Sequence, residues 1–160
     1  MLKKIISGCQ TGADRAGLIA AKSCGLETGG YVCTKNKTEL GYEPELISGY
    51  NLTELNTFDY PKRTLANVNA ADATWIFYRG KLEKGSALTE KYCNQLKKPY
   101  LTIQIDNLNK DAVFEDYSNW LILKNIKVLN IAGNRESVAP GIQQEVIELL
   151  TKVFKNVRFI

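Results

Sequence analysis

Short β-prone apolar runs alternate with helical patterns along most of the chain, and this alternation is the strongest constraint on its fold. We predict strands at about residues 3–7, 29–33, 73–78, 100–105 and 127–131. The last three are β-branched and apolar on both faces, which is typical of a parallel sheet covered by helices on each side. Helical patterns occur at residues 13–23, 61–71, 86–96, 113–123 and 140–154. The sequence therefore predicts a doubly wound α/β sheet with right-handed crossovers and the strand order 2-1-3-4-5.

One long segment, residues 34–59, interrupts this alternation. Its 26 residues are rich in Asn, Thr, Glu, Gly and Tyr and show no clear period. A connection of this length is usually a lid, a binding arm or a subunit contact. Its basic and aromatic residues, with the tyrosine that follows, either close over a ligand or belong to a solvated loop: Lys35, Lys37, Tyr42, Tyr50 and Tyr60. At 160 residues, 44% of them hydrophobic, the chain has the size of one domain, and we predict a single domain over residues 1–160.

A strand, a tight turn and a helix follow one another near the N-terminus. The turn reads Ser7-Gly8-Cys9-Gln10-Thr11-Gly12 and leads into a helix that begins with Ala13-Asp14. The first amides of a helix have no partner within it and lie at the positive end of its dipole, so they attract anions such as phosphate. The two glycines let the main chain approach a ligand closely. The turn is therefore a candidate anion site, with a tight turn that binds nothing as the open alternative.

Polar loops also follow two later strands. Ligands of open parallel sheets bind outside the carboxyl ends of the strands, so we expect these loops to converge with the first turn on one crevice. After residues 73–78, Ser86 either caps the next helix or binds a phosphate. The basic residues of the same loop, Arg79, Lys81 and Lys84, are either ligands or solvated charges.

The loop after residues 127–131 and one helix face complete the candidate crevice. Arg135 offers a planar fork for an oxyanion, and Glu136 accepts from ring nitrogens or a hydroxyl. The alternative is an Arg–Glu pair that pins the loop. Arg63 and Asn67 lie four residues apart on a predicted helix, so they share a face that points either into the crevice or to solvent.

The composition narrows the possible chemistry. The chain has no histidine, which excludes Ser-His-Asp and Cys-His catalysis and every metal site that contains histidine. Its four cysteines form no C-x-x-C pair, so we expect reduced and mostly buried thiols. The net charge of +4 suits a small anionic ligand. The basic residues are spread along the chain and form no run, so we do not expect it to bind nucleic acid. No leader or spanning stretch is evident, so we expect a soluble cytoplasmic protein without a membrane partner.

Taken together, these motifs resemble the family of putative molybdenum carrier proteins, which is similar in turn to the wider lysine-decarboxylase-like group of nucleotide-binding Rossmannoid proteins. The resemblance covers about residues 6–149 in matching order. It rests on the first turn, the segments between, and the last loop: Ser7-Gly8, Gln10 to Asp14, Thr28 to Tyr31, Leu52 to Glu54, Arg63-Thr64, Asn67-Val68, Asp72 to Thr74, Gly85 to Thr89, Asn130 to Gly133, Arg135 to Ser137 and Ala139 to Gly141.

The resemblance implies a Rossmann-like three-layer sandwich that forms homo-oligomers and binds molybdenum cofactor, a pterin that bears a phosphate and a dithiolene-held metal. Helix N-termini and arginine suit the phosphate, and amide and carboxylate groups suit the pterin edge. No catalytic residue and no protein ligand to molybdenum is expected. The implied cofactor-binding residues are Gly8, Gln10, Thr11, Gly12, Asp14, Arg63, Asn67, Gly85, Ser86, Thr89, Gly133, Arg135, Glu136 and Ser137.

Some positions depart from the family pattern. Cys9 stands where a second glycine is more usual, and Cys33-Thr34-Lys35-Asn36 replaces a Pro-Lys-Gly-Arg run, which leaves a basic lid contact to Lys35 and Lys37. The alternative ligand is a phosphorylated nucleotide, bound by a sensing module or cleaved by a nucleoside-monophosphate phosphoribohydrolase with Glu90 or Glu136 as acid or base and Asp14 orienting. The phosphoribohydrolases of that enzyme branch carry a Gly-Gly-x-Gly-Thr-x-x-Glu loop. In this chain Thr89 stands at the position of the motif's glutamate. We therefore favour a carrier over an enzyme.

Overall fold

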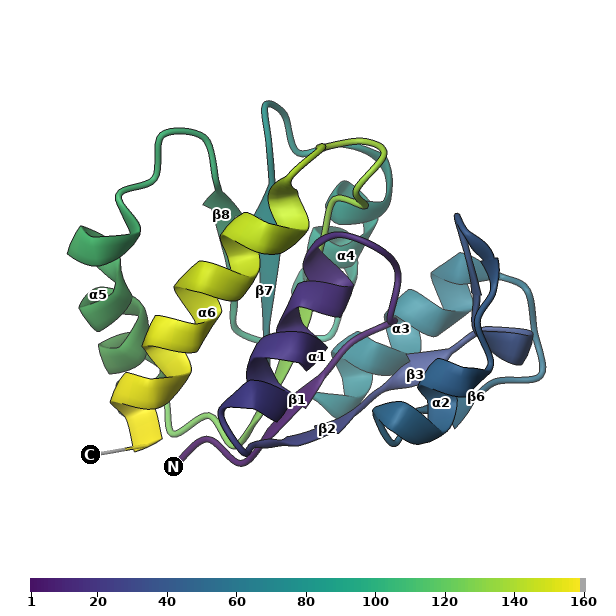
Figure 1. The fold of residues 1–160 in the computed structure, drawn as a ribbon, viewed down its shortest axis with the longest axis horizontal. Coiled ribbons are helices and arrows are strands. Elements are labelled where there is room, and N and C mark those ends of the chain that lie inside the picture. The colour runs from purple at the N-terminus through teal and green to yellow at the C-terminus, as the bar shows by residue number, and fades with distance from the viewer. Residues whose placement is uncertain (159–160) are drawn as a thin grey trace.

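A parallel sheet of five strands forms the centre of the computed structural model, which describes residues 1–158 (Figure 1). Its strands are β1 (Lys4–Ile6), β2 (Glu27–Gly29), β7 (Ala73–Tyr78), β8 (Tyr100–Gln104) and β9 (Val128–Gly133). Every neighbouring pair in this sheet runs parallel. The carboxyl ends of all its strands therefore lie along one edge.

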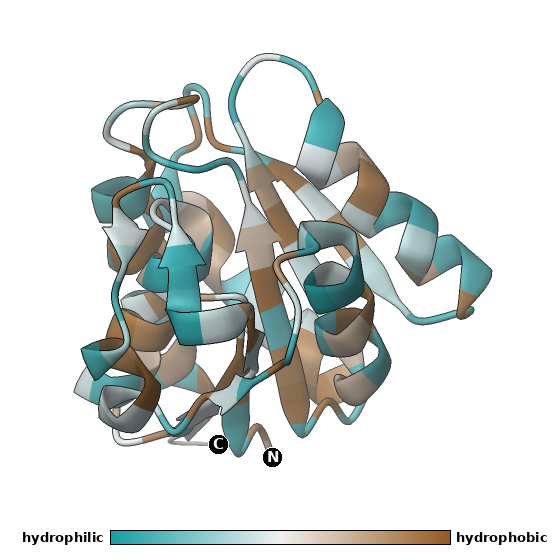
Figure 2. Cartoon of the chain, turned by 90° about the vertical axis from the view of Figure 1, so that its right-hand side faces the viewer, coloured by the Kyte–Doolittle hydropathy of each residue, from teal (hydrophilic) through white to brown (hydrophobic). Residues whose placement is uncertain are grey.

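Helices cover both faces of the sheet. In Figure 1, α1 (Ala13–Ser23), α5 (Lys110–Leu123) and α6 (Ile142–Arg158) lie in front of it, and α3 (Tyr60–Ala70) and α4 (Lys84–Gln95) lie behind. The strands between these layers are largely apolar (Figure 2). Their fully buried side chains include Trp75, Phe77, Leu129 and Ile131. The predicted Rossmann-like sandwich with helices on both faces is confirmed.

The predicted strand order 2-1-3-4-5 is wrong. The order is β2-β1-β9-β7-β8, so the strand that comes last in the sequence lies in the middle. There β9 pairs with β1 through Ile5 and Leu129, and with β7 through Trp75 and Ile131. If β9 is counted first, the order becomes 3-2-1-4-5, which is that of a common doubly wound sheet whose chain has been cut before its second strand.

The strand order differs from the prediction because β8, and not β9, is the edge strand. Its sequence was expected to be apolar on both faces, but Thr102 and Gln104 are exposed while Ile103 is buried. This alternation is that of a half-covered edge strand. In β9, by contrast, three consecutive residues on alternating faces are buried, which marks a strand enclosed on both sides: Leu129, Asn130 and Ile131.

Gly30 breaks the strand that we predicted over residues 29–33. Its φ of +124° turns the chain, and a Cβ there would lie 2.1 Å from the Ser7 carbonyl oxygen. On one side of this turn β2 belongs to the main sheet, and on the other β3 (Tyr31–Val32) pairs with β6 (Thr53–Glu54) in a separate two-stranded sheet.

The long segment 34–59 contains short regular elements. They are a 3-10 turn η1 (Thr34–Asn36), a hairpin of β4 (Lys37–Thr38) and β5 (Gly41–Tyr42), helix α2 (Glu45–Gly49) and strand β6. A small second core joins it to the main body through side chains on both sides: Cys9, Leu18, Val32, Leu46, Ile47, Tyr50 and Leu52. The segment is therefore an arm packed against α1.

Four of the five predicted helices begin at other residues: α3 begins one residue and α5 three residues before the predicted start, and α4 and α6 are each displaced by two. α4 begins at Lys84, so Ser86 lies inside its first turn and does not cap it. α6 begins at Ile142, two residues after Pro140, and runs to the end of the described chain. The four cysteines are buried, as expected. Within residues 1–158, no helix combines the length and apolarity that a membrane span requires.

Candidate functional site

The loops after β1, β7 and β9 meet the start of α3 and enclose a cleft of about 670 Å³. Because β9 lies between β1 and β7, its loop stands between the other two. Most of the implied binding residues line this cleft: Gly8, Gln10, Asp14, Arg63, Asn67, Gly85, Ser86, Thr89, Gly133, Arg135 and Ser137.

Arg63 and Asp14 form the charged floor of the cleft. Arg63 Nη1 lies 3.6 Å from Asp14 Oδ2 and donates to the Gly8 carbonyl oxygen at 2.8 Å. A Cβ on Gly8 would lie 2.3 Å from this Nη1, so only glycine lets the guanidinium approach the turn. Asp14 Oδ2 also accepts from the Gln10 amide, whereas no donor within residues 1–158 engages Oδ1. One carboxylate oxygen thus remains for a ligand.

The Asp14 carboxyl titrates abnormally. Burial raises its pKa above the usual range, and the opposing attraction of Arg63 does not cancel this effect. A raised pKa means that the native state holds the proton more tightly than the unfolded chain does. The stabilisation is then complete below the unfolded pKa of about 3.9 and is lost as the pH rises through the native value.

Replacing Asp14 by asparagine is expected to remove this pH dependence. Between pH 4 and pH 7 the unfolding free energy of the wild type should fall relative to that of Asp14→Asn, because only the wild type loses the proton. Urea denaturation at a series of pH values measures both curves. Asp116→Asn, an exposed change on α5, serves as the control and should run parallel to the wild type. Parallel curves for Asp14→Asn as well would contradict the expectation.

Asn67 lines the cleft, but its side-chain amide is hydrogen-bonded to the backbone of Tyr31. Its Oδ1 accepts from the Tyr31 amide at 2.8 Å, and its Nδ2 donates to the Tyr31 carbonyl oxygen at 2.9 Å. It therefore holds α3 against β3, beside the Gly30 turn.

Five successive amides of the first turn are already engaged by protein acceptors, which leaves less of the turn open to phosphate than the sequence suggests. Those of residues 9–13 donate in order to Ser7 Oγ, Asp14 Oδ2, Gln10 Oε1, Gln143 Oε1 and the Asn134 carbonyl oxygen. Two of these acceptors come from distant parts of the chain. The turn is thus pinned by protein acceptors and offers side chains, rather than these amides, to a ligand.

The start of α4 is open by comparison. No acceptor within residues 1–158 takes the amide of Lys84 or Gly85, and a Cβ on Gly85 would meet nothing within 4 Å. Ser86 is buried beside them and accepts from Asn134 Nδ2 at 3.4 Å, which leaves its hydroxyl hydrogen for a ligand. Thr89 donates to the Gly85 carbonyl oxygen at 2.9 Å. The start of α4 therefore has the unengaged amides and the open space that a helix N-terminus can offer to an anion.

The charge of the cleft is predominantly positive. Arg79 is held by Asp106 at 3.1 Å and by Glu145 at 2.7 Å. Within the described chain, no hydrogen bond or ion pair engages the side chains of Lys81, Lys84 and Arg135. The charged residues of the lining are the cations Arg63, Arg79, Lys81, Lys84 and Arg135 and the carboxylates Asp14 and Glu83. The three unpaired cations line the same cleft as the open start of α4, and the excess of positive charge suits an anion.

Three of the implied residues lie outside the cleft lining. Thr11 donates to Glu39 and accepts from the Glu136 amide, and Gly12 donates to Gln143. Glu136 accepts from the amides of Gly141 and Gln143 and thereby caps the start of α6. Because the Glu136 carboxylate already occupies the amides of Gly141 and Gln143, an anionic ligand could bind them only by displacing it.

Asn134 was missed in the sequence. Its main chain bonds Phe77 and Ala13, its Oδ1 accepts from the Arg79 amide at 2.8 Å, and its Nδ2 reaches Ser86. One buried residue, through its main chain and its side chain together, therefore ties together the loops after β1, β7 and β9. A polar residue directly after an apolar strand and a glycine was the available signal. Of the arm tyrosines and the one that follows, Tyr60 lines the cleft, whereas Tyr50 packs in the small core and Tyr42 is exposed.

Comparisons with known proteins agree with this architecture. The sequence model of the circularly permutated YpsA SLOG family matches residues 5–154. The crystal structure of a "Putative molybdenum carrier protein" from Syntrophus aciditrophicus SB is similar, with 43% sequence identity and a TM-score of 0.88 over 96% of this chain and 94% of that chain. No curated protein sequence gives a significant match. A circular permutation is what the central position of β9 indicates.

Proposed function

The chain belongs to the circularly permutated YpsA SLOG family, and from this premise we propose that it binds and carries molybdenum cofactor in the cleft. The observation that carries the proposal is the open start of α4, in a cleft that is also lined by Lys81, Lys84 and Arg135, three cations without an ion pair within residues 1–158. The similar crystal structure, which is named "Putative molybdenum carrier protein", supports a molybdenum-related ligand.

The phosphate end of the ligand is assigned to α4. The amides of Lys84 and Gly85, which meet no acceptor within residues 1–158, lie at the positive end of the helix dipole, and the Ser86 hydroxyl has a hydrogen to donate. Arg135 adds a guanidinium that forms no hydrogen bond or ion pair within residues 1–158. A phosphate monoester, with two negative charges and several acceptor oxygens, matches this set.

The pterin end is assigned to the floor of the cleft. Asp14 Oδ1 is left to accept from ring N–H groups, and the Gln10 Nε2 has no protein acceptor within residues 1–158. Oxo-transfer chemistry belongs to the molybdenum on the cofactor's own dithiolene. The protein residues hold and orient the organic part, which is the work of a carrier.

The positions of two carboxylates disfavour the hydrolase alternative. Glu90 accepts from the Tyr100 hydroxyl at 3.2 Å and is absent from the cleft lining, and Glu136 caps α6. Neither reaches a ligand held at α4 as a general acid or base would have to.

Thermal unfolding with added ligand tests the proposal. Molybdenum cofactor at a hundredfold excess over its Kd should stabilise the native state by about 2.7 kcal/mol and raise Tm by roughly 5–10 °C. Adenosine monophosphate and inorganic phosphate at the same concentration are the comparison ligands. No shift with the cofactor together with a clear shift with adenosine monophosphate would replace the carrier by a nucleotide-binding protein. Release of ribose 5-phosphate would then identify an enzyme.

A further inference from the structure

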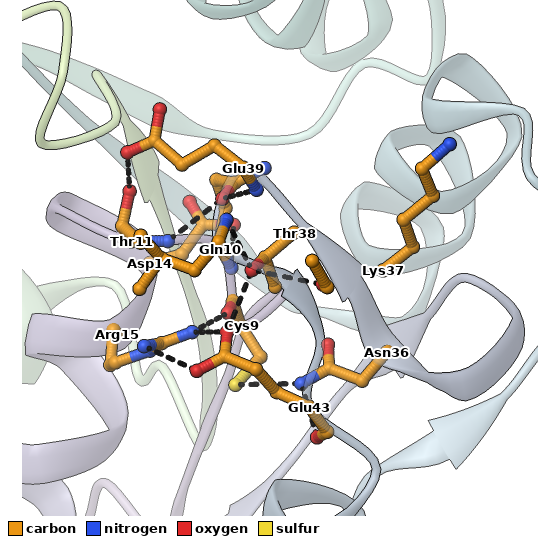
Figure 3. A network of polar contacts seen from close by, with 12 residues as sticks. Cys9, Gln10, Thr11, Asp14, Arg15, Asn36, Lys37, Thr38, Glu39 and Glu43 are labelled. Carbon is orange, nitrogen blue, oxygen red and sulfur yellow. Dashed lines mark hydrogen bonds and ion pairs between the residues drawn. The ribbon is translucent and has the colours of Figure 1, made fainter.

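The tip of the β4–β5 hairpin reaches across to the turn after β1, where Glu39 lies beside Thr11 and Gln10 (Figure 3). Glu39 accepts through Oε1 from the Thr11 hydroxyl and from the Ser137 amide, and through Oε2 from the Ser137 hydroxyl. Thr11 follows β1 and Ser137 follows β9, so a single carboxylate bridges two of the loops that build the cleft.

The groups around this carboxylate form a complete oxyanion site. Burial acts to raise the pKa of Glu39, but the hydroxyls of Ser137 and Thr11 and the Ser137 amide, which donate to its carboxylate, together with the smaller effect of the Arg135 charge hold that pKa below its ordinary value. Hydroxyl and amide donors with one arginine are the groups that bind phosphate in proteins. Arg135 and Ser137 also line the cleft, so the site adjoins it directly.

The hairpin is held separately at its base and at its tip. At the base, Glu43 pairs with Arg15 at 2.7 Å and accepts from the Thr38 hydroxyl at 2.6 Å. At the tip, the Glu39 amide donates to Gln10 Oε1 at 3.0 Å, and the neighbouring Leu40 is 68% exposed. Loss of the Glu39 contacts therefore frees the tip without breaking the ion pair that anchors the arm.

We propose that Thr11, Ser137 and Arg135 form a second phosphate-type subsite beside the cleft, which Glu39 occupies as an internal anion until an anionic ligand group displaces it. The proposal rests on the proposed function only in that the cleft receives an anion. A ligand with one anionic group at α4 and another at this subsite would release the hairpin tip, and Thr11 would then join the cleft wall. A ligand anchored at α4 alone would leave it in place.

Binding of inorganic phosphate to the full chain tests the subsite. Glu39→Gln keeps the shape of the side chain but removes the competing charge, so phosphate should bind about tenfold more tightly, as expected when most of the population is held in the occupied form. Glu45→Gln, on the same arm and exposed without a side-chain partner, is the matched control and should equal the wild type. Adding Ser137→Ala to Glu39→Gln should abolish the gain. Equal affinity of Glu39→Gln and wild type, or a gain that survives Ser137→Ala, would overturn the proposal.

Two further measurements keep the test independent of folding defects and of the carrier function. In the wild type, saturating phosphate should speed hydrogen exchange of the Glu39 amide, because the bond to Gln10 is lost; an unchanged exchange rate would count against displacement. In a Gly85→Val background, which blocks the start of α4, the gain from Glu39→Gln should persist, and its loss would also overturn the subsite. Failure of molybdenum cofactor to bind would leave both results unaltered, so the two proposals fail separately.

Discussion

Replacing Gly30 by alanine is expected to lower the unfolding free energy by about 3–5 kcal/mol, although it adds only one methyl group. The added Cβ would lie 2.1 Å from the Ser7 carbonyl oxygen and 2.7 Å from its nitrogen, and both belong to the backbone beside β1. A flexible side chain would move aside, but this backbone is fixed by the Ser7 amide, which donates to the Gly29 carbonyl oxygen. The φ of +124° adds strain that L residues rarely tolerate. Urea denaturation measures the loss.

Gly41→Ala separates the two causes. Gly41 has a comparable φ of +102°, but a Cβ there meets nothing within 4 Å. Its replacement should therefore cost only the backbone strain, about 1–3 kcal/mol. If Gly30→Ala and Gly41→Ala cost the same, the close contact with Ser7 does not determine the stability of this turn.

Replacing Gly85 by valine is expected to weaken binding of molybdenum cofactor by at least about 100-fold. The side chain would fill the space in front of the Lys84 and Gly85 amides, and two charge-assisted hydrogen bonds of roughly 1.5–3 kcal/mol each would be lost. Because nothing lies within 4 Å of that Cβ, the unfolding free energy should change by no more than about 0.5 kcal/mol. Equilibrium dialysis measures the affinity, and denaturation checks the fold.

Arg135→Ala should weaken the same binding by about tenfold, since one exposed charge-assisted contact is removed. Lys91→Ala removes an exposed cation from the outer part of α4 and should bind as the wild type does. Full affinity in both Gly85→Val and Arg135→Ala would mean that the ligand binds elsewhere.

The local elements were predictable because their signals are local. The periodicity of β7 and the helix after Pro61 identify a strand and a helix without knowledge of their neighbours. The order of the strands was not predictable in the same way, since it depends on which strand is covered on both faces. In β8 the polar Thr102 and Gln104 flank the apolar Ile103, and this alternation indicates a strand that is covered on one face only.

The same distinction explains the site. The resemblance brought Arg63, Ser86 and Arg135 together from distant parts of the sequence, and they line one cleft. The glycine-rich first turn looked like an anion cradle because its competing acceptors cannot be seen locally. Gln143 and Asn134 lie more than a hundred residues away, yet they take the amides of Gly12 and Ala13. Whether the implied residues bind cofactor stays a prediction.

The central position of β9 has a consequence for synthesis on the ribosome. When residues 1–127 have emerged, β2 can pair with β1, and β7 can pair with β8, but the strand that lies between these two pairs, β9, has not been made. Each presents an unpaired inner edge, one along β1 and the other along β7, and both wait for a strand that has not been made. The nascent chain therefore exposes two unpaired strand edges until its last fifth appears, and only then can the loop after β9 complete the cleft.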